Sequence, residues 1–403
     1  MRIAILSRYN GLVNRGIESW AINLCRQLEG LGHTCLLIQG GADVPRDAPF
    51  RTVSLPVKRR KEFPFIHRGI VATVIGHCYL DAANREAAIF SARALPHLIA
   101  FHPDVIIPAS YLWTVVAAKI AGWVLRGKPR IAITSHAGWS YLERDALRLG
   151  INGFAAVQPL IYDWATEFER GRTAVELIPY GVEIERFASG PTAPLNLAHP
   201  VVIVVSALED YKRVDMAVRA VARSGMSLLL LGDGPNSDLV TRLARALLDP
   251  RRFLHLPKVA HADVAAYYRA ADVFSLPSTS GEAFGIVILE AMAAGLPVVV
   301  NDDPVRRWIA GSQGLFIDPS DTEAYADALV QAVTRPRASA PDAHLSRFGW
   351  PAIAEAYARF FARLGAEERC SRAALAPLRL PFSIAIRLGE LFVNVARRAL
   401  RPS

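Results

Sequence analysis

The sequence of 403 residues has little cysteine and no long apolar run. Its four cysteines show neither a Cys-x-x-Cys spacing nor the paired spacing of a zinc finger, so we expect reduced thiols, as in a cytosolic protein. No run approaches the roughly 20 apolar residues that a membrane-spanning helix needs. The opening residues 1–10 turn polar too early for a signal peptide. We therefore expect a cytoplasmic protein.

Charged residues are also sparse, at 21%, whereas hydrophobic residues make up 52%, which is typical of a globular chain. A chain of this length exceeds what one hydrophobic core usually serves, so we expect two domains. The net charge of +9 would suit a nucleic acid, a membrane surface or an anionic substrate. Because no recognised nucleic-acid-binding module carries this charge, we do not expect nucleic acid as a partner.

The order of apolar and amphipathic segments predicts an α/β fold. Residues 2–7 have the pattern of a buried strand and residues 17–32 that of an amphipathic helix, followed by a second strand. The same order restarts at residues 200–235, after a stretch near 188–199 that is rich in Pro, Gly and Ala and typical of a linker. Each half of the chain therefore predicts a Rossmann-like unit.

We accordingly predict two Rossmann-like domains that face each other across a cleft. The first spans residues 1–190 and the second spans residues 200–345. In such parallel sheets ligands bind at the carboxyl ends of the strands, and the first amides of the helices are free to hold phosphate. The loops that follow the strands are therefore the places to search for chemistry.

Two glutamates eight positions apart mark one of these loops. Glu282 lies in a Ser/Gly-rich stretch just before a predicted helix, and Glu290 lies inside its otherwise apolar run IVILEAMAA. Gly285 lets a ligand approach the backbone closely. Glu290 is either an ordinary solvent-facing residue or a buried carboxylate that needs a partner, such as the paired hydroxyls of a ribose.

The segment GEAFGIVILEAMAAGLPVV resembles the Glu-x7-Glu donor-site segment of retaining GT-B glycosyltransferases of family 4, the glycosyl transferases group 1. The resemblance covers the body of the chain to about Leu364 and implies the GT-B fold. It implies that Glu290 contacts the ribose of a nucleotide sugar, and that Glu282 lies near the transferred sugar as a catalytic residue. The amides that it implies on phosphate or sugar oxygens belong to Phe284, Gly285 and Ile286.

The segment SALEDYKRVDMAVRAV resembles the family's strand, loop and helix that bear a basic pair for the donor diphosphate. Lys212 matches the lysine, whereas the usual arginine falls on Ala207. Arg213 occupies a position that is often glycine, and we expect it to supply the second charge. Without the resemblance, a solvated basic turn would explain both residues equally well. The resemblance also implies that backbone around Lys258 and Val259 holds the nucleotide base.

Three segments near the first domain fit the same family. NRGIES resembles its Gly-Gly loop with Arg15 in place of one glycine, which implies that the Gly16 amide faces the donor phosphate. ITSHAGWS resembles a strand end with a histidine that faces the donor sugar, here His136, which we expect to be catalytic. Residues 346–365 resemble the helix that returns to the first domain, and we interpret their aromatic stripe as core.

The family's reaction proceeds with retention of anomeric configuration and without metal, so we expect no metal or other cofactor. The acids at 301–304 follow a strand, but they do not form the Asp-x-Asp pair of a metal-dependent donor site. Two alternatives share the fold. A nucleotide-sugar epimerase would use the donor without an acceptor, and a non-catalytic scaffold would explain Ala207. A dinucleotide oxidoreductase is disfavoured, because G-x-G-x-x-G is missing.

The tail carries much of the positive charge: from Arg369 onward there are seven arginines and a single acid. Residues 366–403 are predicted to form a basic amphipathic tail, whose part 380–401 would either lie on an anionic membrane surface or pack on the protein. Residues 57–69 add basic and aromatic side chains to the domain expected to bind the acceptor. We therefore expect transfer of a hexose to a saccharide or lipid-linked acceptor, in polysaccharide or glycolipid assembly at the inner face of the membrane.

Overall fold

The computed structural model describes residues 1–12, 16–43, 47–57, 81–109, 112–126, 129–136, 141–278 and 282–366. The basic segment 57–69, apart from its first residue, and the tail beyond Ala366 lie outside this part of the chain.

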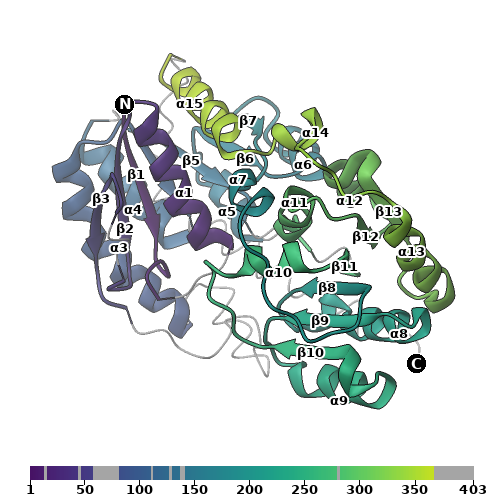
Figure 1. The fold of residues 1–403 in the computed structure, drawn as a ribbon. Coiled ribbons are helices and arrows are strands. Elements are labelled where there is room, and N and C mark those ends of the chain that lie inside the picture. The colour runs from purple at the N-terminus through teal and green to yellow at the C-terminus, as the bar shows by residue number, and fades with distance from the viewer. Residues whose placement is uncertain are drawn as a thin grey trace, which may run out of the picture. The chain divides into compact units, whose positions relative to one another are not determined.

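Within the described residues, the chain divides into two compact units, one made of Met1–Ile178 with residues 354–366, the other of Pro179–Ile353 (Figure 1). The division falls before the linker predicted near 188–199. The reason is that α7 (Ile184–Ala188) packs against α10 (Val264–Ala270) and α11 (Ile286–Ala293) of the second unit.

The first unit is built, within the described residues, on a seven-stranded parallel sheet of order β3-β2-β1-β4-β5-β6-β7. Its inner strand β1 pairs Ile3 with Cys35 on one side and with Val105 on the other. All three are buried, as a parallel sheet covered on both faces requires. Its strands are β1 (Arg2–Ser7), β2 (Thr34–Gln39), β3 (Arg51–Ser54), β4 (Val105–Pro108), β5 (Arg130–Thr134), β6 (Gly153–Ala156) and β7 (Ala174–Leu177).

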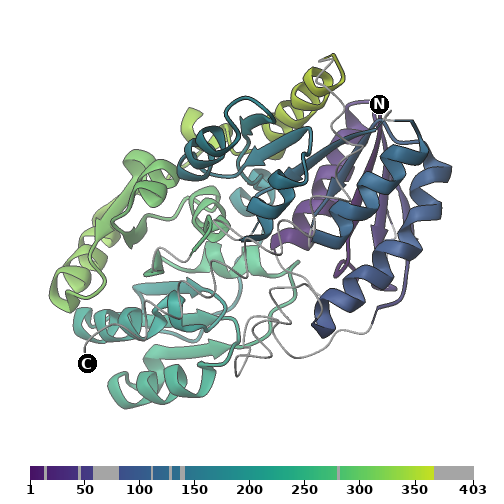
Figure 2. The ribbon, with the colours of Figure 1, turned by 180° about the vertical axis from the view of Figure 1, so that it is seen from behind.

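Helices cover this sheet, and α3 and α4 lie side by side (Figure 2, blue). The side chain of Asp81 caps α3 by accepting a hydrogen bond from the Asn84 amide. The helices are α1 (Gly16–Gly30), α3 (Ala82–Phe101), α4 (Leu112–Val124), α5 (Tyr141–Arg148) and α6 (Pro159–Glu169). The predicted helix over 17–32 thus ends two residues earlier, at Gly30.

The second unit has a six-stranded parallel sheet of order β10-β9-β8-β11-β12-β13. Its strands are β8 (Val201–Val205), β9 (Ser227–Leu231), β10 (Phe253–Leu256), β11 (Val273–Leu276), β12 (Val298–Asn301) and β13 (Gly314–Ile317). Besides α7, α10 and α11, its helices are α8 (Val214–Ser224), α9 (Ser237–Leu247), α12 (Pro304–Ala310), α13 (Thr322–Thr334) and α14 (Ala343–Ser346), with short 3-10 turns at Asp210–Lys212, Pro250–Arg252 and Gly311–Gln313.

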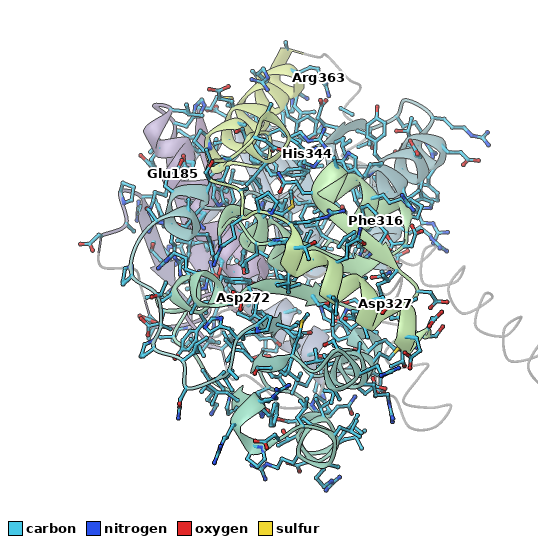
Figure 3. All side chains as sticks on the ribbon, turned by 45° about the vertical axis from the view of Figure 1, so that its right-hand side comes forward. Glu185, Asp272, Phe316, Asp327, His344 and Arg363 are labelled. Atoms are coloured by element: carbon cyan, nitrogen blue, oxygen red, sulfur yellow. The ribbon has the colours of Figure 1, made fainter. Side chains whose placement is uncertain are left out.

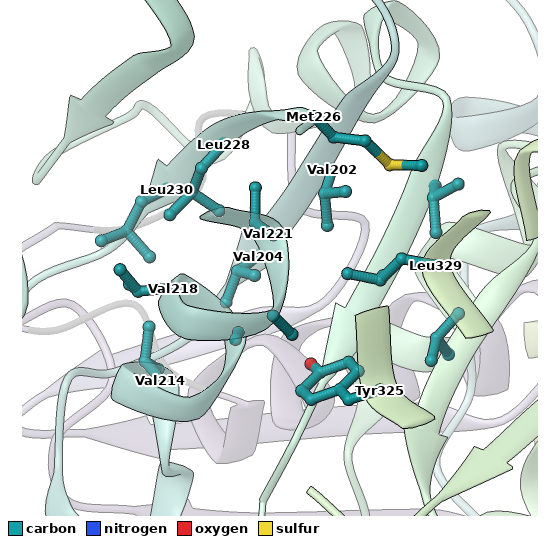
Figure 4. Packing of buried hydrophobic residues seen from close by; sticks show 14 of the residues in the cluster. Val202, Val204, Val214, Val218, Val221, Met226, Leu228, Leu230, Tyr325 and Leu329 are labelled. Carbon is teal, nitrogen blue, oxygen red and sulfur yellow. The ribbon is translucent and has the colours of Figure 1, made fainter. Parts of the chain in front are cut away.

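The core of the second unit follows from the apolar strands and amphipathic helices seen in the sequence. Val202 and Leu228 from adjacent strands meet Val218 of α8 and Leu329 of α13 (Figure 4). On the opposite side of α13, Asp327 points outward (Figure 3). Two Rossmann-like α/β units are therefore present, which confirms the predicted fold.

Helix α15 (Trp350–Ala366) begins in the second unit and continues in the first. The Tyr357 hydroxyl lies 3.0 Å from the Thr134 hydroxyl at the end of β5. A Cβ on Gly153 would lie 2.7 Å from the ring of Phe360, so the helix packs directly on β6. The prediction of a returning helix with an aromatic core stripe is confirmed, although the helix begins at Trp350 and not at 346.

Candidate functional site

The loop between β11 and α11 carries most of the predicted donor residues. Gly285 adopts a left-handed backbone with φ of 91° immediately before Ile286, the first residue of α11. A side chain there would be strained, and its Cβ would lie 3.3 Å from the Ile288 side chain. The first amides of a helix lack intrahelical acceptors and carry the positive end of its dipole. The amides of Gly285 and Ile286 are thereby suited to hold an anion.

The side chain of Phe284 fixes this loop to the body of the second unit. It is buried, and its ring packs edge-to-face on Tyr180 at 5.2 Å and on Trp308 at 6.2 Å between centroids. Phe348 lies 6.5 Å away in the same aromatic cluster. The ring of Phe284 therefore fixes the position of the neighbouring amides, and the ligand contact predicted for its own amide stays a prediction.

Glu282 and Lys212 meet in the structure. The Lys212 ammonium group donates to Oε2 of Glu282, and the two side chains are only 11% and 12% exposed. Beneath them, the buried Arg306 donates from Nη2 to the backbone carbonyl of Glu282 at 3.4 Å. Arg306 also lies 3.4 Å from the carboxylate of Asp303. The residues predicted to face the sugar and the diphosphate thus share one site.

Glu290 lies on α11, about one helical turn after its first residue Ile286. The Tyr268 hydroxyl donates to its Oε2 at 2.9 Å, so one carboxylate oxygen is fixed by the protein. Glu290 keeps part of its surface exposed. Burial raises the pKa of its carboxyl group to about 7, against the opposing effects of the Tyr268 hydrogen bond and of Arg186. Of the two sequence alternatives, the structure supports a largely buried carboxylate with a partner.

The side chain of Arg213 contacts Met216 and not Glu282, the partner of Lys212. Its φ is 51°, the left-handed region that favours glycine, which agrees with the glycine expected there from the resemblance. Its Nη2 lies 2.7 Å from Sδ of Met216, and its charge lowers the pKa of Asp318 slightly, after the larger effects of Ser320. Ala207, where the usual arginine is missing, is exposed.

Val259 lies in the loop after β10, partly exposed, next to the exposed Lys258. Two residues further, His261 meets the guanidinium of Arg186, which lies 2.9 Å from its Nε2. Arg186 is also paired with Glu183 at 2.8 Å. Since Arg186 acts on the Glu290 carboxyl group as well, this arginine links the loop expected to hold the base with the residue expected to hold the ribose.

Two predicted residues belong to the first unit. Gly16 is exposed as the first residue of α1, and a Cβ there would meet only open space. His136 follows β5, and its ring packs edge-to-face on Trp20 at 4.5 Å. Burial lowers the pKa of His136 to about 3, so the imidazole is neutral at physiological pH. A neutral imidazole can donate hydrogen bonds to sugar hydroxyls and accept them, and it carries no positive charge that would attract the diphosphate.

The acids at 301–304 have structural roles. Asp303 accepts hydrogen bonds from the Val305 and Arg306 amides and so caps α12, while Asp302 pairs with Arg307 on the surface. Among the residues described by the structure, no group of three or more His, Cys, Asp or Glu side chains is placed to hold a metal ion.

Sequence reasoning missed Tyr268 and Arg306. The spacing of Ala265 and Tyr268, both buried on α10, is a helical signal that places this tyrosine on the inner face. Arg306 and its neighbour Arg307 cannot be distinguished by pattern, although one is buried and the other exposed.

Comparison with known proteins identifies the family. Residues 191–344 match the family model described as glycosyl transferases group 1. Over 387 residues the chain is 35% identical to the phosphatidyl-myo-inositol mannosyltransferase of Mycobacterium leprae, covering 90% of this chain and 96% of that protein. The chain belongs to the group 1 glycosyltransferases.

Two further relatives fit this assignment. The chain is 29% identical over 266 residues to the GDP-mannose-dependent alpha-(1-6)-phosphatidylinositol monomannoside mannosyltransferase of Mycolicibacterium smegmatis, covering 57% of this chain and 68% of that one. A glycosyltransferase structure from Rickettsia africae shares the fold with a TM-score of 0.67 at 16% identity, covering 91% of this chain and 99% of that one.

As a group 1 glycosyltransferase, the protein is an enzyme, as predicted. In the part of the chain that the structure describes, no helix of this glycosyltransferase is long and apolar enough to span a bilayer. Its second unit brings together an ammonium group, a carboxylate and a helix N-terminus. That combination can bind a diphosphate next to a sugar.

Proposed function

We propose that this glycosyltransferase moves mannose from GDP-mannose to a lipid acceptor with an inositol-containing head group. Its relatives from Mycobacterium leprae and Mycolicibacterium smegmatis support this choice, because their names specify mannosyl transfer to phosphatidylinositol lipids and, for the second, GDP-mannose as donor. The identity to the first extends over nearly its whole length.

The arrangement of Lys212, Glu282 and the start of α11 carries the donor half of the proposal. The ammonium group and the first amides of the helix are suited to the two phosphates of a nucleotide sugar. Glu282 is then next to the sugar attached to the second phosphate. Glu290, with one oxygen held by Tyr268, presents the other to the ribose hydroxyls.

The reaction needs stabilisation of the departing diphosphate, an aligned acceptor hydroxyl and exclusion of water. Lys212, Arg213 and the helix dipole at Gly285 supply the first. The bond between the anomeric carbon and the diphosphate breaks, and the acceptor oxygen attacks on the same face. Attack on this face retains the anomeric configuration, and the acceptor proton passes to the leaving phosphate. Glu282 orients the sugar hydroxyls, and backbone at Val259 holds the base.

Transfer can be measured with GDP-mannose labelled in the sugar and vesicles that contain phosphatidylinositol. We expect a labelled lipid with wild-type protein and at least about a hundredfold less with Glu290→Ala, as for loss of a contact to bound substrate. UDP-glucose and UDP-galactose serve as donor controls. Transfer from a UDP-sugar but not from GDP-mannose would reject the donor assignment, and transfer only to a soluble saccharide would reject the acceptor assignment.

Two finer features of the proposal are tested on the same product. Proton–carbon coupling at the anomeric centre of the product reports retention, and an inverted product would contradict it. Full activity after exhaustive treatment with EDTA is expected for a metal-independent reaction. Loss of activity in EDTA that only added Mn²⁺ or Mg²⁺ restores would overturn this part of the proposal.

We further propose that the enzyme works at the inner face of the membrane, with residues 380–401 on the anionic surface. The excess of arginine in this part of the sequence supports it. Vesicles with and without anionic lipid distinguish binding by charge from incidental association. A protein lacking residues 370–403 that still sediments with anionic vesicles and keeps its activity on lipid acceptor would contradict this role.

A further inference from the structure

We infer that Tyr268 is a positioning residue of the donor site, whose hydroxyl holds the Glu290 carboxylate in the orientation and charge state that receive the nucleotide ribose. This inference rests on the proposed function, since it assumes that Glu290 meets the ribose.

The position of the Tyr268 hydroxyl is set by the packing of its ring. The residue is fully buried, with the ring of Phe187 edge-to-face at 5.6 Å and that of Phe274 at 6.0 Å. These contacts place the hydroxyl 2.9 Å from Oε2 of Glu290 and 3.4 Å from the carbonyl oxygen of Val287, one turn earlier on α11. A hydroxyl buried this deeply costs free energy unless it is bonded. Phenylalanine would fill the same space without that cost, so the hydroxyl has a role beyond packing.

The hydrogen bond divides the two oxygens of Glu290 between protein and ligand. Oε2 accepts from Tyr268, which leaves Oε1 and the remaining lone pairs for ribose hydroxyls. A carboxylate with one oxygen anchored cannot rotate freely about its last torsion. The site is thereby organised before the nucleotide arrives, which lowers the entropy lost on binding.

The same contact favours the ionised form of Glu290. Burial raises the pKa of this carboxyl group to about 7, while donation by Tyr268 and the charge of Arg186 lower it, and Glu183 raises it. Charged groups on the other helices against α11 bond elsewhere, and Arg269 of α10 donates to the Arg186 carbonyl at 2.9 Å. Arg306 of α12 lies on Asp303 and the Glu282 carbonyl, and His344 of α14 lies 2.8 Å from the Ile309 carbonyl. Tyr268 is thus the uncharged group that helps to keep Glu290 able to accept two hydroxyls near neutral pH.

The neighbouring residue provides a matched control. Tyr267 lies on the same helix but is only partly buried, whereas Tyr268 is completely buried. Tyr268→Phe and Tyr267→Phe make the same chemical change one position apart. Both keep their aromatic rings, and thermal unfolding of each variant verifies that the protein remains folded.

The test is the affinity for GDP, with UDP as a second probe, measured by calorimetry from pH 5.5 to 9. Wild-type affinity is expected to weaken below about pH 7, as Glu290 takes up a proton. We call the pH at which affinity begins to weaken the break. In Tyr268→Phe the break moves to higher pH by about one unit, and affinity at pH 7 falls about tenfold, as for a lost hydrogen bond to a charged group. Tyr267→Phe behaves as wild type. Because the nucleotide phosphate also titrates in this range, the break is taken as the difference from Glu290→Gln.

Turnover provides a second readout. Tyr268 does not touch the transferred sugar in this assignment, so Tyr268→Phe raises KM for the donor and leaves kcat within about twofold. In the Glu290→Ala background, where the hydroxyl has no acceptor at this position, Tyr268→Phe has no further effect on GDP affinity.

The possible failures can be told apart. Wild-type protein that binds neither GDP nor UDP would reject the proposed function and this inference with it. Wild-type protein whose pH break depends on Glu290, combined with an unchanged break and affinity in Tyr268→Phe, would reject the inference alone. An equal loss of affinity in Tyr268→Phe at every pH, persisting in the Glu290→Ala background, would reduce Tyr268 to a packing residue.

Discussion

Lys212 and Glu282 are 70 residues apart in the sequence, yet the Lys212 ammonium group donates directly to the Glu282 carboxylate. Each side chain is almost buried, so their attraction is weakly screened by water. The cation proposed to bind the diphosphate therefore has an anionic partner in the second unit itself. A bound diphosphate would have to share Lys212 with Glu282 or replace Glu282 as the partner of Lys212.

This pair predicts opposite effects of Glu282→Gln on binding and on transfer. Removing the negative charge leaves Lys212 to the nucleotide, so GDP should bind about threefold to tenfold more tightly. Transfer should fall by about a hundredfold or more, because a polar group near the reacting sugar is lost. Calorimetry with GDP and initial rates with GDP-mannose check the two parts. Weaker GDP binding in Glu282→Gln would show that Glu282 does not compete for Lys212.

The adjacent arginines of α12 predict a difference in stability. Arg306 is buried and meets both Asp303 and the Glu282 carbonyl, whereas Arg307 forms an exposed pair with Asp302. Arg306→Met leaves buried polar atoms without their partner and should lower the free energy of unfolding by about 2–4 kcal/mol.

The control is Arg307→Met, which removes an equally long side chain from the surface and should cost less than about 1 kcal/mol. Urea unfolding of the two variants gives the comparison. Equal effects would mean that the Arg306 contacts contribute little to the second unit.

The apolar strands and the helix boundaries around the site were predictable from local pattern, because an entirely apolar run can fold only as a buried strand or helix. The position of Glu282 before α11 and of Glu290 inside it followed from the same pattern. The partner of each glutamate did not. Lys212 and Tyr268 reach them across the chain, and such contacts depend on the order in which strands join the sheet. The buried state of Arg306 has the same cause.

Arg213 offers a test of backbone strain apart from charge. Its φ of 51° costs about 1 kcal/mol for a residue with a Cβ, a cost that glycine avoids. Arg213→Gly should therefore match or exceed wild type in stability while binding GDP about tenfold more weakly, if its guanidinium meets the diphosphate. Arg213→Lys keeps a cation and should recover part of the affinity. Unchanged affinity in Arg213→Gly would leave Lys212 as the main side-chain cation for the donor.

His136 predicts how the first unit loses stability in acid. Its folded pKa is about 3 because of burial, below its ordinary value of 6.5. The unfolded chain therefore binds a proton that the folded chain does not, and stability should fall as pH drops from 6.5 toward 3. The slope approaches about 1.4 kcal/mol per pH unit for one proton. Urea unfolding followed by the fluorescence of tryptophans, among them Trp20 beside this ring, gives the measurement, with His136→Gln as the reference that lacks the group.

Glu290 has the opposite sign and supplies the control. Its folded pKa of about 7 lies above its ordinary value of 4.5, so its contribution is present at low pH and is lost as pH rises through this range. Relative to Glu290→Gln, wild-type protein should therefore lose stability toward pH 7, whereas relative to His136→Gln it should lose stability toward pH 4. Burial disfavours the charged form of each group, and the charged forms of His136 and Glu290 appear at opposite ends of the pH range. If stability relative to both Gln variants changed in the same direction with pH, one of the two groups would not be buried.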